Sequence, residues 1–162
     1  SSIPWMMFLL IFFWTPPHFW ALALFRSEEY HKVGIPMLPS IKGFKRTLIE
    51  MKIYSILLIF LAAIPLIWPQ YGIDWSYSIV VVILGVWYYR SISDIDTEES
   101  LDDKGRLPSA LKSFLRSLKY LAAMFSTLVL IAAIQSPIVS LIVLAVSFGL
   151  MCFFTARFMS TP

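Results

Sequence analysis

The residues best suited to chemistry form a short cluster of opposite charges. Glu28 and Glu29 are adjacent acids, and Arg26 and Lys32 lie on either side of them. Carboxylate oxygens are preferred ligands of Mg²⁺, while arginine and lysine neutralise phosphate oxygens. The cluster therefore predicts a site for a magnesium-bridged phosphate. Taken alone, it is also typical of an ordinary charged helix end.

His18 is a second candidate, because it follows Pro16 and Pro17 inside an apolar run. Proline removes a backbone donor and clashes with the carbonyl four residues earlier, so the pair predicts a kinked, protein-facing helix. A kink that serves packing alone explains the pair equally well. An ionisable residue at this depth is expected to hydrogen-bond to a neighbouring helix or to contact substrate, and metal ligation by a lone histidine is disfavoured. If the helix continues, His18 and Glu29 share one face.

Long apolar runs must position these residues. Of the 162 residues, 59% are hydrophobic and 14% are charged, and the mean hydropathy is +0.77. About 20 apolar residues in a helix cross a bilayer, and a soluble domain carries about 25% charge. We therefore predict an all-α, multi-pass transmembrane helical bundle with about five spans, at residues 3–25, 53–68, 75–89, 118–134 and 138–154.

The basic residues predict one topology. Of the 13 lysines and arginines, six lie between the first and second spans, six lie from the end of the third span to the start of the fourth, and Arg157 follows the fifth. Cytoplasmic loops retain such residues, so the segments of about 26–52 and 90–117 are predicted to be cytoplasmic. The basic residues behind the net charge of +3 would then lie at the membrane surface, close to lipid. Nucleic acid is therefore not an expected partner. The acidic stretch 91–104 lacks the spacing of a calcium loop and is predicted to be solvated.

A longer motif surrounds the acid pair. The run Pro-Pro-His-Phe-Trp-Ala-Leu from Pro16 is followed by arginine, two acids, tyrosine and then Gly-Ile-Pro-Met-Leu-Pro, which ends at Pro39. This stretch closely resembles the segment that marks protohaem IX farnesyltransferases (haem O synthases), which are UbiA-type intramembrane prenyltransferases with nine helices. Residues 110–121 show a weaker similarity to the family's entry into a late helix.

The resemblance implies an enzyme of haem A and cytochrome oxidase biogenesis. A farnesyl group would pass from farnesyl diphosphate to a vinyl group of haem B, which is substrate and not cofactor, and water would add to the same vinyl group. Mg²⁺ would assist departure of the diphosphate. The expected location is the bacterial inner membrane, with the mitochondrial inner membrane as the alternative. Proteins of haem A synthesis or oxidase assembly would be partners.

The resemblance also implies roles for individual residues. Glu28 and Glu29 would be the catalytic, metal-binding acids, although the family usually has aspartate at the position of Glu29. The substrate-binding residues would be His18, Arg26, Tyr30 and Lys32. Glutamate moves the carboxylate by about one carbon–carbon bond, so direct metal ligation could become binding through water.

One part of the family pattern has no counterpart in this sequence. The family's first acidic motif, an asparagine–aspartate pair followed by spaced aspartates, belongs to an earlier helix. We therefore expect residues 1–162 to be the C-terminal part of a single prenyltransferase domain, and to be inactive alone. The fifth span is one helix more than the family's usual ending. Two alternatives stay open: a UbiA-type prenyltransferase with a quinone or lipid acceptor, and a non-enzymatic membrane bundle.

Overall fold

The computed structural model describes residues 3–67 and 75–133, together with positions 142, 145 and 149. Long helices account for most of the described ranges, and no strand occurs in them. The helices are α1 (Ile3–Phe25), α2 (Ser27–Lys32), α3 (Leu38–Lys42), α4 (Phe44–Ile67), α5 (Trp75–Ser93) and α6 (Pro108–Ala133). The all-α prediction is confirmed for this part, whereas the predicted fifth span, residues 138–154, falls outside it apart from isolated positions.

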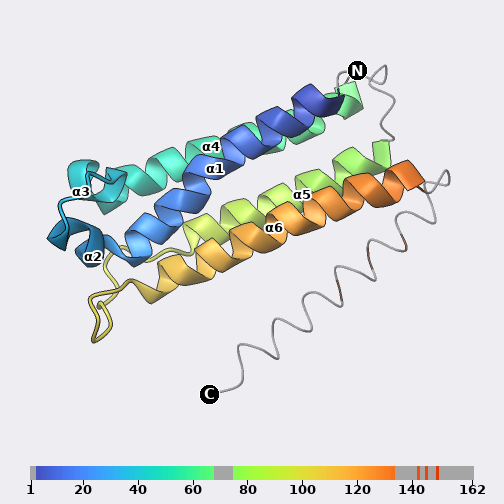
Figure 1. Cartoon of the computed structure of the whole chain (residues 1–162). Coiled ribbons are helices and arrows are strands. Elements are labelled where there is room, and N and C mark those ends of the chain that lie inside the picture. Colours follow the sequence, from blue (N-terminus) through green and yellow to red (C-terminus); the bar gives the residue numbers. More distant parts are fainter. Residues whose placement is uncertain (1–2, 68–74, 134–141, 143–144, 146–148, 150–162) are drawn as a thin grey trace.

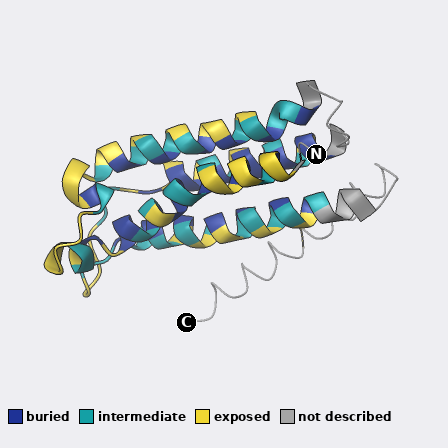
Figure 2. Cartoon of the chain, turned by 45° about the horizontal axis from the view of Figure 1, so that its top comes forward, coloured by how far each residue is buried: buried dark blue, intermediate teal, exposed yellow. Residues whose placement is uncertain are grey.

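The four long helices form a bundle (Figure 1). Helix α1 packs against α4 and α6, and α5 packs against the same two helices, so the order around the bundle is α1, α4, α5, α6. Helices α2 and α3 lie together at one end of it (Figure 1). The buried faces turn toward one another and the exposed positions turn outward (Figure 2).

Two helices within the described ranges are long and apolar enough to cross a membrane. They are Pro4–Phe25 and Phe44–Pro65, with mean hydropathies of 1.6 and 2.0, and Tyr77–Ser93 is a shorter apolar helix. The outward faces of α1 and α4 expose large apolar side chains, among them Trp5, Phe8 and Phe60. Exposed apolar surface of this extent is rare in soluble monomers and is compatible with lipid.

The segment predicted as a loop between the first two spans is largely helical. It contains α2, α3 and the first two turns of α4, which begins at Phe44 and not near residue 53. Arg46 and Glu50 form an ion pair one turn apart in these first turns. Such pairs stabilise a helix that emerges from an apolar environment, so polar residues extend the helix beyond its apolar run.

The charged segments meet at one end of the bundle. The end of α1, the start of α4, the end of α5 and the start of α6 all lie there (Figure 1). These junctions bring the two basic segments together, as the predicted topology requires. That this end faces the cytoplasm stays a prediction.

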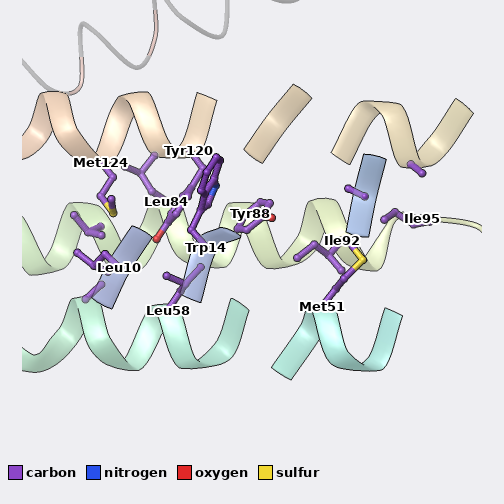
Figure 3. Packing of buried hydrophobic residues seen from close by; sticks show 14 of the residues in the cluster. Leu10, Trp14, Met51, Leu58, Leu84, Tyr88, Ile92, Ile95, Tyr120 and Met124 are labelled. Carbon is purple, nitrogen blue, oxygen red and sulfur yellow. The ribbon is translucent and has the colours of Figure 1, made fainter. Parts of the chain in front are cut away.

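The core is aromatic at its centre. Trp14, Tyr88 and Tyr120 lie together between α1, α5 and α6 (Figure 3). The rings of Tyr88 and Tyr120 stack with centroids 5.1 Å apart. Helices α4 and α5 approach closely at Gly85, where an added Cβ atom would lie 2.7 Å from Cγ1 of Ile59. A side chain at this position would force Ile59 or the two helices to shift.

Candidate functional site

His18 is held in the bundle core. Its ring lies between the rings of Trp14 and Phe114, with centroid distances of 4.3 and 4.6 Å and interplanar angles of 19° and 23°. Its Nδ1 atom is 2.6 Å from the Oγ atom of Ser117 on α6. Only 8% of the residue is exposed. The expected hydrogen bond to a neighbouring helix is therefore present, while contact with substrate stays a prediction.

Ser117 makes two short polar contacts beside this histidine. Its hydroxyl donates to the carbonyl of Phe114 at 2.6 Å, which uses its one proton. With the Ser117 proton on that carbonyl, the Nδ1–H tautomer of His18 donates to the Ser117 oxygen. The indole of Trp14 donates to the backbone carbonyl of Ser117 at 3.1 Å. One turn of α6 thus anchors two side chains of α1.

The condition under which His18 and Glu29 would share one helical face, a helix that continues past residue 25, is not met. Helix α1 ends at Phe25, and Arg26 has φ −107° and ψ 30°, outside the helical range, before α2 begins. The chain changes direction at this residue. His18 therefore lies in the core, whereas Glu29 lies at the charged end of the bundle.

Glu29 contacts an arginine that the sequence did not single out. Atoms Nε and Nη2 of Arg106 both lie 2.7 Å from Oε1 of Glu29. Arg26 approaches the other carboxylate oxygen at 3.8 Å. The Arg106 guanidinium also lies 5.4 Å from the centre of the Phe25 ring, a cation–π distance. Two arginines thus neutralise this carboxylate.

The loop between α5 and α6, residues 94–107, presents Arg106. Asp102 accepts hydrogen bonds from the amides of Lys104 and Arg106, at 2.9 and 2.8 Å, so a tight turn forms. Gly105 has φ +71°, and an added Cβ atom there would lie 2.8 Å from Oε2 of Glu28. The amide of the next residue, Leu107, donates to the carbonyl of Phe25 at 3.2 Å. The loop is therefore docked on the junction between α1 and α2.

A pocket of about 450 Å³ opens beside α2. It lies between α2 and the α3–α4 junction and is lined by Ser27, Glu28, His31, Lys32, Pro39, Ser40 and Phe44. Within it, Nζ of Lys32 lies 3.5 Å from Oε2 of Glu28. Of the predicted site residues, Glu28 and Lys32 therefore line the pocket, whereas Arg26, Glu29 and Tyr30 do not.

Comparison with known proteins identifies the family. The model of the UbiA prenyltransferase family matches residues 1–118. The chain belongs to the UbiA prenyltransferase family. It is 39% identical over 141 residues to "Protoheme IX farnesyltransferase 2" of Nitrobacter winogradskyi, which covers 86% of this chain and 44% of that protein. It is 40% identical over 130 residues to "Protoheme IX farnesyltransferase" of Nitrobacter hamburgensis, covering 80% and 40%. The chain thus spans less than half the length of these relatives, and no solved structure matches it.

The carboxylates at the charged end of the bundle can be compared with the ligands that Mg²⁺ prefers in proteins. The structure shows no group of three or more His, Cys, Asp or Glu residues placed to hold a metal in its described ranges. Magnesium commonly binds one or two carboxylates and completes its shell with water and substrate phosphate. Glu28 in the pocket fits that pattern with Lys32 beside it. Glu29 fits it only when its pairs with Arg106 and Arg26 open.

Proposed function

We propose that this chain takes part in protohaem IX farnesyl transfer, in which farnesyl diphosphate and haem B give haem O. The observation that carries the proposal is the identity of about 40% with relatives bearing that name, over most of this chain. The pocket at the charged end supports it, because its Glu28 and Lys32 suit a metal-bound diphosphate.

The position of the pocket suits the two parts of the donor. A diphosphate is too strongly charged to enter hydrocarbon, whereas a farnesyl chain is apolar. The pocket lies where α2 meets the start of α4, beside helices with apolar outward faces. We therefore place the diphosphate in the pocket, with the farnesyl chain toward the membrane.

In the reaction, the bond between farnesyl C1 and the diphosphate oxygen breaks, and C1 bonds to a vinyl carbon of haem B. Water adds to the other vinyl carbon and a proton is released. Mg²⁺, when bound, would neutralise charge on the departing diphosphate. Glu28 would hold the metal, and the Lys32 ammonium would neutralise phosphate oxygens. The hydroxyls of Ser27 and Ser40 can donate hydrogen bonds in the same pocket.

The other predicted roles are also part of the proposal. Arg26 and Tyr30 lie on or next to α2 but outside the pocket lining, so they would contact diphosphate oxygens that project beyond it. Membrane lipid surrounds the bundle, and the bacterial inner membrane is the proposed location because the relatives are bacterial. Proteins of haem A synthesis or oxidase assembly are the proposed partners.

The test uses the protein expressed from its full reading frame and purified in detergent. With farnesyl diphosphate, haem B and Mg²⁺, the product separated by chromatography should have the mass of haem O. Glu28→Gln should raise the Mg²⁺ concentration needed for half-maximal activity by roughly tenfold, since one charged ligand is lost. The matched control is Glu98→Gln, because Glu98 is 79% exposed and pairs only with Lys45 among the described residues.

Two results would contradict the proposal. A wild-type protein that prenylates a quinone and leaves haem B unchanged would assign a different acceptor. Equal Mg²⁺ requirements for Glu28→Gln and wild type would remove Glu28 from the metal site.

A further inference from the structure

We infer that the two adjacent acids have different tasks: Glu28 serves the pocket, while Glu29 and Arg106 form an ion pair that positions α2. Glu29 and Arg106 are thus positioning residues, and Arg106 is not among the site residues predicted from the sequence. The inference rests on the proposed function of the pocket and deepens it.

Helix geometry separates the two carboxylates. Consecutive residues of an α-helix point about 100° apart, so the two carboxylates diverge. Both still lie near the loop between α5 and α6, because the Glu28 carboxylate lies against Gly105 of that loop. Glu28 pairs with Lys32, four residues later on the same face, and both line the pocket. Glu29 points to the loop between α5 and α6, where Arg106 binds it. Glu28 therefore lines the pocket and would hold a metal there, whereas Glu29 is not part of the lining.

Helix α2 needs external contacts to keep its orientation. It has six residues, and helices this short are not stable by themselves. Its first turn has no side-chain cap, because Arg26 stands at the cap position without such a hydrogen bond. The loop between α5 and α6 stabilises the orientation of this helix. It does so through the Arg106–Glu29 ion pair and through the hydrogen bond from the Leu107 amide to the Phe25 carbonyl, next to the start of α2.

The Arg106–Glu29 pair is partly withdrawn from solvent and joins two segments that are far apart in the sequence. Side-chain exposure is 26% for Arg106 and 40% for Glu29, and the guanidinium donates one short hydrogen bond, from Nε, and makes a second close contact with the same carboxylate oxygen. Such charge-assisted, geometrically defined contacts contribute more than flexible exposed pairs. The turn held by Asp102 fixes the Arg106 backbone, so little conformational freedom is lost when the pair forms. Gly105 lets this backbone approach Glu28 closely, which couples the loop to the pocket.

A double-mutant cycle on the full-length protein tests the inference. Glu29→Gln and Arg106→Gln should each raise the KM for farnesyl diphosphate roughly tenfold, with the KM for haem B unchanged, because α2 holds only the diphosphate end. The double variant should be no worse than either single one. Arg106→Lys should recover part of the loss. The matched control is Arg116→Gln, whose partner Asp94 lies at the end of the same loop.

A second readout does not require turnover. Hydrogen exchange of the α2 amides should quicken by roughly tenfold in Glu29→Gln and in Arg106→Gln, and stay at the wild-type rate in Arg116→Gln. If the wild type makes no haem O, the proposed function fails, while faster exchange in both variants still supports the positioning pair. The inference is overturned if the Arg106→Gln protein matches wild type in both KM and exchange. It is equally overturned if the two single losses multiply in the double variant, because Glu29 would then bind metal independently of Arg106.

Discussion

Replacement of His18 by alanine separates a packing role from a substrate role. The change removes the hydrogen bond to Ser117 and the stacking on Trp14 and Phe114. A hydrogen bond between helices within a membrane contributes about 0.6 kcal/mol on average and up to about 1.7. Each aromatic contact adds about 0.5–1.5 kcal/mol, and the space left by the ring adds a cavity cost. We expect a loss of roughly 2–5 kcal/mol of stability.

The assay is thermal unfolding of the detergent-purified protein, measured together with haem O formation on the same sample. A cycle with Ser117→Ala isolates the hydrogen bond, and its coupling energy should be about 1 kcal/mol. Phe19→Ala is the matched control, since Phe19 is the next residue, touches the His18 ring only edge-on and is half exposed. Its loss of stability should be clearly smaller.

One pattern of results would refute this reasoning. If His18→Ala unfolds at the wild-type temperature and no longer converts haem B, the side chain contacts substrate and its packing contributes little. If the variant is destabilised and its folded fraction keeps normal turnover, the structural role is sufficient.

Two further predictions concern packing and topology. Gly85→Ala should lower stability by about 1–3 kcal/mol, because the new methyl group meets Ile59 at 2.7 Å, and Ile59→Ala in the same protein should recover part of this loss in thermal unfolding. Equal stability of Gly85→Ala and wild type would mean that α4 and α5 separate at no cost. Cysteines placed at Lys42 and at Gln70 should react with an impermeant reagent from opposite sides of the native membrane, and reaction of both from one side contradicts the topology.

Much of the fold follows from the sequence alone, because a lipid environment and the length of the apolar runs restrict the possible secondary structures. Runs of about 20 apolar residues exclude strands in lipid and predict helices, and four of the five predicted runs are helices in the described part. The segment that ends at Pro39 was long and specific enough to indicate the family, which the comparison confirms. The helix starts were less predictable. The run at residue 53 begins as a helix at Phe44, since polar residues extend a helix without changing the apolar pattern.

The candidate site also contains contacts that local spacing predicts and contacts that only tertiary packing decides. Local spacing brought Glu28 and Lys32 together, because residues four apart share a helical face, and the structure places both in one pocket. Spacing could not assign Glu29 to Arg106, which lies 77 residues away and is one of many basic residues that topology already explains. Nor could it pair His18 with Ser117, 99 residues away. Which side chains meet across a bundle depends on how the helices rotate and pack against one another. Tertiary packing alone therefore decided that one glutamate faces the pocket while its neighbour holds a loop.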